Sequence, residues 1–334
     1  MKKQLCLFAA VLTVALCAAA PAGAQTAASA DAWPSKPVKL IVPFSAASSA
    51  DNLARALAER LSARFKQPFI VDNRTGAGGT IGVAAAAKSP PDGYTLLLTT
   101  SSPLVISPLI DKTVAYDVQK ELVPVAEITS GGLLLVSGSE VPAKNLKELI
   151  ELIRKNPGKF SFASNGNGSY SHMAMELFKQ KTGTFLVHIP YKGPAQAETD
   201  VMGGQVTLMF DSVATGTEMI KAGRLRAYGI SSLAPDPLAP QYPPLAAQGV
   251  PELKDFDVIG WAGLLAPRGT PPAVVSALTT AVRELTGDAA FRTLMTRRNS
   301  TLVAPEAVGD MARHLQVDRK RWEAVVKSAN IKLE

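Results

Sequence analysis

Short apolar runs alternate with amphipathic stretches along most of the chain. The run 38–42 is apolar and β-branched and stops at Pro43, which is typical of a strand buried on both faces of a parallel sheet. A loop of small residues follows. From Asp51 to position 65, leucine or phenylalanine recurs every four residues, so one face of a helix is apolar. The stretch therefore predicts a strand, a loop and a helix N-terminus.

The same alternation continues toward the C-terminus and predicts an α/β protein with a parallel sheet. Further strands are expected at 68–72, 94–100, 123–128, 133–137, 160–163, 187–190, 206–210, 226–230 and 259–265. Helices are expected at 80–88, 145–154, 171–182, 272–285, 288–298 and 305–329, with others between the strands that follow residue 187.

Two features divide this pattern into two lobes. Gly131 and Gly132 separate two expected strands, and the pattern restarts after them. The proline-rich stretch 231–257 indicates an irregular return to the first lobe. A length of 334 residues also suggests two domains, at ~150 residues per domain. The expected organisation is a discontinuous first lobe, 33–130 with 232–334, and a second lobe, 131–231.

The chain begins with the pattern of a secretory signal peptide. Lys2 and Lys3 precede an apolar run over 5–20, and Ala22-Gly-Ala ends in a small-x-small cleavage site. The run is too short for a membrane span of ~20 residues. Removal of residues 1–24, with cleavage near Ala24, and export of the mature chain are expected.

Cysteine content and charge limit the kinds of site and ligand that are expected. Both cysteines, Cys6 and Cys17, lie inside the expected signal peptide, so neither a disulfide nor a cysteine metal site is expected. Lipidation of Cys17 is the alternative, which the bulky Leu16 disfavours. Two lysines leave with residues 1–24, which lowers the formal net charge from +7 to +5, and the basic residues are scattered. This mildly favours small anions and argues against nucleic acid.

The loop after the first strand is the first candidate site. Unpaired N–H groups and the positive end of the helix dipole point into such a loop, and small side chains let an anion reach the backbone. Ser45, Ser48 and Ser49 add hydroxyl donors. The alternative is an ordinary strand-to-helix turn with Ser49 or Asp51 as the N-cap.

Glycines mark two later loops. Gly76, Gly78 and Gly82 are spaced G-x-G-x-x-x-G, one residue too long for a dinucleotide loop, so a plain turn is favoured. The loop 164–172 again joins a strand to a helix, and its glycines permit close approach to the backbone. Its candidate binding residues are Asn165, Gly166, Gly168 and Ser169. A turn with a serine cap is the alternative.

Polar residues also follow three other strands. Asp211 follows the strand 206–210, Thr100 and Ser101 end the strand 94–100, and Tyr191 follows the strand 187–190. Ligands of open α/β sheets bind at such C-terminal strand ends. A helix N-cap is the alternative for the region of Asp211.

His172, beside Ser169 and Ser171, raises the hypothesis of a serine hydrolase. The sequence around these serines lacks the G-x-S-x-G elbow that exposes a nucleophile. The three histidines, His172, His188 and His314, have no metal-ligand spacing. Packing of His172 in the first helical turn is favoured, and neither a catalytic residue nor a metal site is expected.

Nine short motifs follow one another along the expected mature chain. They are Trp33-Pro-x-Lys-Pro, Val42-Pro-Phe, Asp72-Asn-Arg-x-Gly-Ala-Gly-Gly-x-Ile-Gly, Pro91-Asp-Gly-Tyr-Thr-Leu-Leu, Ala163-Ser-x-Gly-Asn-Gly-Ser, Pro190-Tyr-Lys-Gly, Gly203-Gly-Gln-Val, Met209-Phe-Asp and Gly263-Leu-Leu-Ala-Pro-x-Gly-Thr-Pro. Together they resemble the extracytoplasmic substrate-binding receptors of tripartite tricarboxylate transporters, the Bug-type family.

The resemblance implies a type II periplasmic-binding-protein fold, in which two α/β lobes close on a small organic carboxylate held by loop N–H groups and ordered waters. It implies a periplasmic location and no cofactor. Together with the strand-end and loop arguments, it gives the expected ligand-binding residues Phe44, Ser45, Ala46, Ala47, Ser48, Ser49, Thr100, Ser101, Asn165, Gly166, Gly168, Ser169, Tyr191 and Asp211.

The first loop departs from the family pattern. The family commonly has proline followed by glycines, whereas this chain has Ser45-Ala-Ala-Ser-Ser-Ala before Asp51. Alanine is disfavoured at positive φ, so the resemblance leaves the substrate open.

The expected function is that of a monomeric receptor that binds a small carboxylate, closes by a hinge and delivers it to inner-membrane transporter subunits. A binding protein that reports to a sensor kinase would use the same residues. A secreted hydrolase using Ser169 or Ser171 with His172 is a further alternative.

Overall fold

The computed structural model describes residues 33–298 and 300–331, so the expected signal peptide lies outside the described residues. Residues from Pro34 onward belong to one unit. No helix in the described ranges is long and apolar enough to cross a membrane.

Nine strands of the described residues join in a single sheet, in the order β2-β1-β3-β9-β4-β7-β5-β6, with β8 also paired to β4. The strands are β1 Val38–Val42, β2 Phe69–Asn73, β3 Thr95–Thr100, β4 Leu122–Gly138, β5 Ser161–Ser164, β6 Val187–Pro190, β7 Leu208–Ser212, β8 Leu225–Ile230 and β9 Ile259–Pro267. β1 to β3 with their helices are called the first lobe below, and β5 to β8 with theirs the second.

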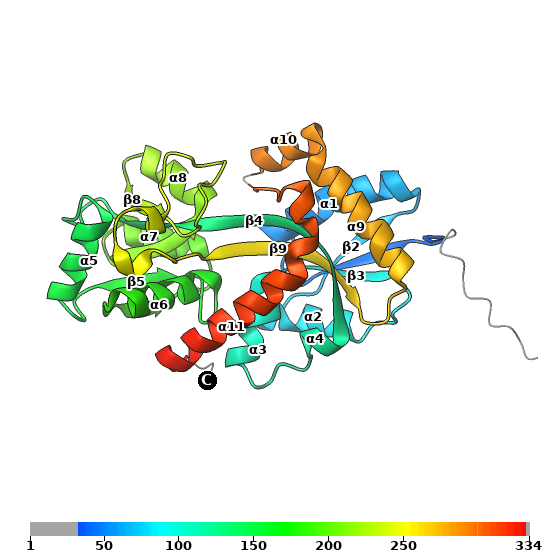
Figure 1. Cartoon of the computed structure of the whole chain (residues 1–334), viewed down its shortest axis with the longest axis horizontal. Helices are drawn as coiled ribbons and strands as arrows, with labels where there is room; N and C mark the ends of the chain where they lie inside the picture. The colour runs from blue at the N-terminus through cyan, green and yellow to red at the C-terminus, as the bar shows by residue number, and fades with distance from the viewer. Residues whose placement is uncertain (1–32, 299, 332–334) are drawn as a thin grey trace, which may run out of the picture. The chain divides into compact units, whose positions relative to one another are not determined.

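Helices cover this sheet in both lobes (Figure 1). They are α1 Ser49–Phe65, α2 Thr80–Ala87, α3 Ser107–Ile110, α4 Val118–Glu121, α5 Leu146–Lys155, α6 Tyr170–Thr182, α7 Pro194–Met202, α8 Val213–Lys221, α9 Pro272–Gly287, α10 Ala289–Arg297 and α11 Met311–Ala329. A π-helical turn, Ser102–Ile106, precedes α3, and a 3₁₀ turn, Pro305–Asp310, begins the segment expected as one helix over 305–329.

Two of the expected strands, 123–128 and 133–137, are one strand, so the predicted break at Gly131 and Gly132 is wrong. Both glycines stay in register with β9, opposite Gly260 and Ile259. A Cβ on Gly132 would lie 2.7 Å from Cγ1 of Ile230, so glycine here allows close packing on β8 and does not interrupt the strand.

The expectation of a parallel sheet holds only inside each lobe. β1 pairs parallel with β2 and β3, and β5 pairs parallel with β6 and β7. β9 is antiparallel to β3 and to β4, and β4 is antiparallel to β7 and β8. The two long strands therefore run in opposite directions between the lobes, as Figure 1 shows, and each lobe joins its parallel strands to them.

The C-terminal helix α11 contacts both lobes. It packs on α6 of the second lobe, on the 102–106 turn of the first lobe and on β4 between them. Trp322 of α11 is fully buried, and the ring of Tyr170 meets it edge-on with centroids 5.5 Å apart. The C-terminal helix is therefore packed against both lobes.

Gly82 explains the glycine spacing that resembles a dinucleotide loop. It lies inside α2, where an added Cβ would be 2.6 Å from the Arg74 carbonyl oxygen and 2.7 Å from Cβ of Pro43. The glycine lets α2 pack directly against the end of β1, which is a packing requirement and not a phosphate contact.

We expect Gly82→Ala to destabilise the protein by about 1–3 kcal/mol, because the crowding atoms belong to backbone and a proline ring. Urea unfolding followed by circular dichroism measures this change. Gly309→Ala is the matched control, because no atom lies within 4 Å of its added Cβ. Equal stability of the two variants would contradict the packing role.

Candidate functional site

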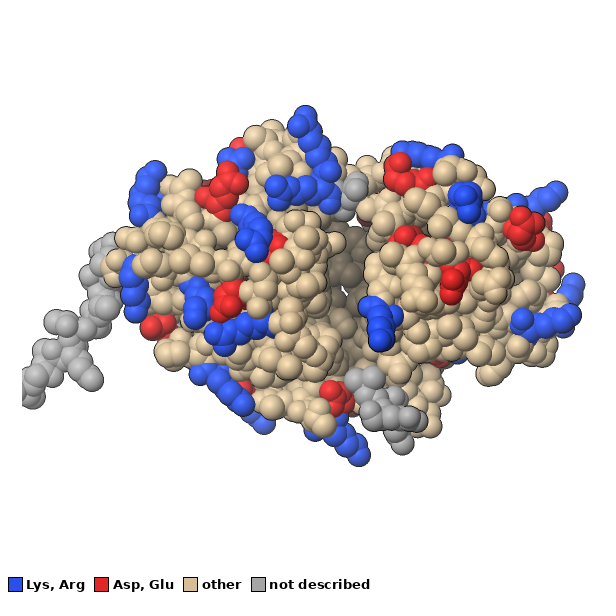
Figure 2. Space-filling view, turned by 180° about the vertical axis from the view of Figure 1, so that it is seen from behind, with Lys and Arg blue, Asp and Glu red and all other residues tan. Residues whose placement is uncertain are grey.

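A cavity of about 1480 Å³ lies between the lobes. The first lobe lines it with Phe44, Ser49 and Thr100, the second lobe with residues of the 165–171 loop and 210–215, and the connecting strands β4 and β9 with 129–133 and 260–262. Figure 2 shows the hollow between the two masses of the molecule, with basic and acidic side chains interspersed on the surrounding face.

Three helices begin at this cavity. Ser49 and Ala50 of α1, Tyr170 and Ser171 of α6, and Val213 and Ala214 of α8 all line it. The first N–H groups of a helix have no carbonyl partner within the helix, and the helix dipole makes this end positive. The convergence of three such ends makes the cavity suited to an anion.

The loop before α1 is closed by its own hydrogen bonds. Ser48 is the N-cap, since its Oγ accepts from the Asp51 N–H at 3.2 Å, so the alternative that placed the N-cap at Ser49 or Asp51 names the wrong residue. The Asp51 carboxylate accepts from the Ala47 N–H and from Arg55 Nε, each at 2.9 Å. This contact holds Ala47 at φ 65°, the left-handed conformation that glycine adopts easily and that costs alanine energy.

Asp51 is therefore the buried centre of the first loop. Burial acts to raise the pKa of this carboxyl, but hydrogen bonds from Arg55, Asn73 and the Ala47 N–H outweigh it and hold the pKa below its usual value. Its other oxygen accepts from Asn73 Nδ2 at 2.9 Å, which ties the loop to the end of β2.

The loop 164–169 is closed in the same way. Gly166 N–H donates to Ser164 Oγ at 3.2 Å, and Gly168 N–H donates to His172 Nδ1 at 3.1 Å. Ser169 N–H donates to the Gly166 carbonyl oxygen at 3.1 Å, and Ser169 Oγ caps α6. These three N–H groups are occupied inside the loop, and the cavity beside it is lined by Asn165, Asn167 and the start of α6.

One hydrogen bond joins this loop to the other side of the cavity. Ser102 Oγ donates to the Gly168 carbonyl oxygen at 3.0 Å. Gly168 has φ 71°, and a Cβ there would lie 2.2 Å from Cδ1 of Ile110. Residues 102–110 and the 164–169 loop thus touch at a position whose backbone conformation favours glycine.

Asp211 is the buried carboxyl of the cavity. Its Oδ1 accepts from the Ser212 N–H at 2.7 Å and from Thr215 Oγ1 at 3.0 Å. Its Oδ2 and Oε1 of the neighbouring Glu198 are both buried, and no donor among the described residues binds either oxygen. Burial, and then the negative charge of Glu198, raise the pKa of Asp211 to about 7.

Aromatic side chains form part of the cavity wall. The indole N–H of Trp261 donates to Asp318 Oδ2 of α11 at 2.8 Å, and the Tyr170 hydroxyl donates to the carbonyl oxygen of Ile259. Both aromatic residues line the cavity, so a ligand has apolar surface beside the helix ends.

Eight of the fourteen expected ligand-binding residues line the cavity: Phe44, Ser49, Thr100, Ser101, Asn165, Gly168, Ser169 and Asp211. The structure places the other six, Ser45, Ala46, Ala47, Ser48, Gly166 and Tyr191, outside its lining. Four of these six form the turn before α1. The Tyr191 hydroxyl donates to Asp200 at 2.6 Å, and burial and that carboxylate raise its pKa to about 12.

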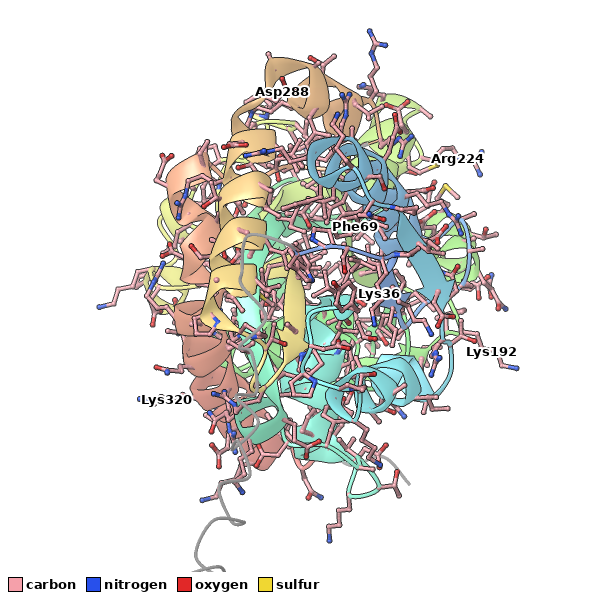
Figure 3. All side chains as sticks on the ribbon, turned by 90° about the vertical axis from the view of Figure 1, so that its right-hand side faces the viewer. Lys36, Phe69, Lys192, Arg224, Asp288 and Lys320 are labelled. Atoms are coloured by element: carbon pink, nitrogen blue, oxygen red, sulfur yellow. The ribbon has the colours of Figure 1, made fainter. Side chains whose placement is uncertain are left out.

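Sequence reasoning missed several residues that line the cavity. The first is the N-terminus of α8, for which Ser212 followed by Thr215 is a usable N-cap signal. Nothing in the sequence indicates that Trp261 and Tyr170 line a cavity. Trp261 lies within an expected strand and Tyr170 beside an expected helix turn, and both patterns predict only that these side chains are buried. Lys112 and Arg298 are the basic residues of the described lining, whereas Lys192, Arg224 and Lys320 point away from the ribbon (Figure 3).

No cluster of three or more metal-ligating side chains occurs among the residues that the structure describes. His172 packs in the first turn of α6, as expected, where it is buried against Phe162 and His188.

The sequence profile described as "Tripartite tricarboxylate transporter family receptor" matches residues 53–331. The chain belongs to this family. The resemblance that the nine motifs carry is confirmed, and the family is one of receptors.

Similar proteins align with nearly the whole length of the chain. "Protein BugT" of Bordetella pertussis is 37% identical and aligns over 94% of this chain and 96% of its own. Among solved structures, R. palustris Rpa4515 with adipate has a TM-score of 0.76 at 32% identity, covering 90% of this chain and 99% of that one. MatC from Rhodopseudomonas palustris with bound malate has a TM-score of 0.73 at 29% identity, covering 88% and 100%. The expected two-lobe α/β fold of periplasmic binding proteins is thereby confirmed.

We expect Asp51→Asn to destabilise the protein by about 1–3 kcal/mol at pH 7, because an amide cannot accept from all three donors around it. The folded-state pKa is lowered, so the carboxylate stabilises above its unfolded pKa of about 4, and this stabilisation is lost as the pH falls through the folded value. Urea unfolding at pH 7 and at about pH 3 should therefore show the difference shrinking in acid.

The control for this prediction is Asp255→Asn. Asp255 makes an exposed ion pair with Lys181, and such pairs contribute about 1 kcal/mol or less. A loss of stability at pH 7 as small as that of the control would contradict the central role of Asp51.

Proposed function

We propose that this protein is a periplasmic solute-binding receptor that holds a small organic carboxylate in the cavity between its lobes. It then closes by a hinge and delivers the ligand to a tripartite tricarboxylate-type transporter. The observation that carries the proposal is the convergence of the N-termini of α1, α6 and α8 on one cavity.

Two related structures support the carboxylate. Rpa4515 is described with adipate and MatC with bound malate, and both share the fold over most of the chain. Both ligands are dicarboxylates, so one carboxylate can meet helix N–H groups while the remainder of the ligand contacts the aromatic wall.

The proposed ligand contacts are the eight expected residues that line the cavity, together with the first turn of α8. In this proposal Ser45, Ala46, Ala47 and Ser48 act indirectly, by shaping the turn before α1. Gly166 and Tyr191 shape the 164–169 loop, since the Tyr191 N–H donates to the Ser164 carbonyl oxygen.

The proposed moving units are the expected lobes, 33–130 with 232–334 and 131–231. Support comes from β4, which continues through the predicted boundary at 130/131, and from its antiparallel partner β9, because this strand pair is the natural hinge. The proposal includes export with cleavage near Ala24, a monomer, and transient contact with inner-membrane transporter subunits.

Signalling to a sensor kinase would use the same cavity and stays an alternative. The hydrolase alternative is disfavoured by the surroundings of His172. Its Nδ1 accepts from the Gly168 N–H, and its Nε2 lies 3.8 Å from Glu176 Oε1, so neither ring nitrogen is hydrogen-bonded to Ser169 or Ser171. Ser164 does contact His188, but Ser164 is completely buried.

We expect a thermal-shift screen of the mature protein to detect binding of one class of carboxylates. The panel contains aliphatic and aromatic mono-, di- and tricarboxylates, with adipate and malate included. At about 100 times Kd a ligand adds about 2.7 kcal/mol of stability, which is a rise of several degrees in Tm. Hexanediol, which has the carbon chain of adipate without its charges, is the control. An equal shift with hexanediol, or no shift with any carboxylate, would refute the carboxylate proposal.

We expect Asp211 to make carboxylate binding depend on pH. An anionic ligand beside it disfavours the ionised form, so the complex takes up a proton and the affinity for adipate falls by up to about tenfold per pH unit above pH 7. Asp211→Asn mimics the protonated form and should bind adipate with little pH dependence between about pH 6 and pH 8. Calorimetric titration measures both.

Asp111→Asn is the control for this slope. Asp111 also lines the cavity, but hydrogen bonds from Thr113 lower its pKa, so it is ionised throughout the range. Its variant should keep the wild-type pH dependence. Affinity that rises with pH would mean that ionised Asp211 accepts a hydrogen bond from the ligand, which contradicts the proposed role.

A further inference from the structure

A buried histidine and a half-buried one lie beside the 164–169 loop. The rings of His172, on α6, and His188, on β6, are stacked with centroids 3.9 Å apart and planes 8° from parallel. Phe162 of β5 stacks on His188 at 4.7 Å. The proposed function gives this stack no task.

Both histidines are hydrogen-bonded to the loop. His172 Nδ1 accepts from the Gly168 N–H at 3.1 Å, so its ring hydrogen is on Nε2, which faces Glu176. His188 Nε2 and Ser164 Oγ are hydrogen-bonded at 2.6 Å. Ser164 Oγ also accepts from the Gly166 N–H. The two ends of the loop are thus connected through the stacked rings.

We propose that His172 is a positioning residue for the ligand-binding loop, and that its burial in the stack of aromatic rings keeps it in the neutral form that this task requires. The acceptor Nδ1 fixes the peptide before Gly168, while Ser102 Oγ holds the carbonyl oxygen after it. The first turn of α6 begins directly after this clamp, so its N–H groups are aimed by it.

The charges around the stack favour the neutral form. Burial, followed by the charges of His188 and Lys179, lowers the pKa of His172 to about 3, and burial and Lys179 lower that of His188 to about 4. Glu176 would favour a charged His172, but its Oε1 is paired with Lys179 Nζ at 2.6 Å. A protonated Nδ1 would place a donor against the Gly168 N–H and release the loop.

The third histidine provides an internal reference. His314 Nδ1 lies 2.6 Å from Glu127 Oε2, and this hydrogen bond raises its pKa. NMR of the ligand-free protein with isotope-labelled histidine should therefore show His314 gaining a proton first as the pH falls, while His172 and His188 stay neutral to about pH 5. His172 should carry its hydrogen on Nε2.

Two variants separate positioning from packing. His172→Phe keeps an aromatic ring in the stack but has no acceptor, whereas His172→Asn loses the ring and offers its Oδ1 near the place of Nδ1. We expect the Gly168 amide to exchange with solvent about tenfold faster in the phenylalanine variant than in the asparagine variant. Amides of β1 and β3 report whether global stability is unchanged.

Ligand binding is the second readout, and only this arm rests on the proposed function. Calorimetry with adipate and malate should give a Kd raised about tenfold in His172→Phe and restored toward wild type in His172→Asn. If neither compound binds the wild type, the choice of ligand fails, while the exchange of Gly168 still decides the positioning role.

The proposal is overturned by any of three results. These are equal protection of Gly168 in the phenylalanine variant and the wild type, greater damage from asparagine than from phenylalanine, or a wild-type His172 ring with its hydrogen on Nδ1. The last result needs no variant, so it decides the matter even where a substitution prevents folding.

Discussion

The antiparallel pairing of β4 with β9 is the constraint on which the rest of the structure depends. The two strands stay paired from Leu122 opposite Pro267 to Gly132 opposite Ile259, with register shifts along the way. Each lobe attaches its parallel strands to this pair, and 129–133 and 260–262 contribute to the cavity. The position of every ligand-facing helix end therefore depends on two strands that also connect the lobes, which couples the geometry of the cavity to any bending there.

The loop before α1 and the 164–169 loop each join a strand to a helix, but different side chains hold them. Each must turn sharply into a helix while leaving the first N–H groups of that helix unoccupied. The first loop uses the Asp51 carboxylate, which binds the N–H of Ala47 and thereby keeps alanine in a conformation suited to glycine. The second uses a neutral imidazole bound to the N–H of Gly168. In both, a buried acceptor binds one of the loop's own donors, and the start of the following helix lines the cavity.

The sequence predicted the elements well because each has a local pattern: apolar runs for β1 and β3, and four-residue spacing for α1. It could not predict that β4 is continuous, because paired glycines are compatible with both a break and a closely packed strand. The rule that ligands meet strand ends found Asp211 at the cavity, but it also selected Tyr191, whose hydroxyl is bound by Asp200. Which donors are already occupied depends on contacts distant in sequence, such as Asn73 with Asp51, and local patterns carry no trace of them.

Contacts between residues far apart in the sequence also connect the cavity wall to the C-terminal helix α11. Trp261 faces the cavity, but its indole N–H is held by Asp318, and Arg321 lies 3.4 Å from that carboxylate. Tyr170, at the start of α6, packs on Trp322 one turn further along α11. Trp261 of β9 and Tyr170 of the second lobe are therefore both held against α11. In the proposed hinge closure, a change in the angle between the lobes must either move α11 with the second lobe or break one of these contacts, so α11 would take part in the closure.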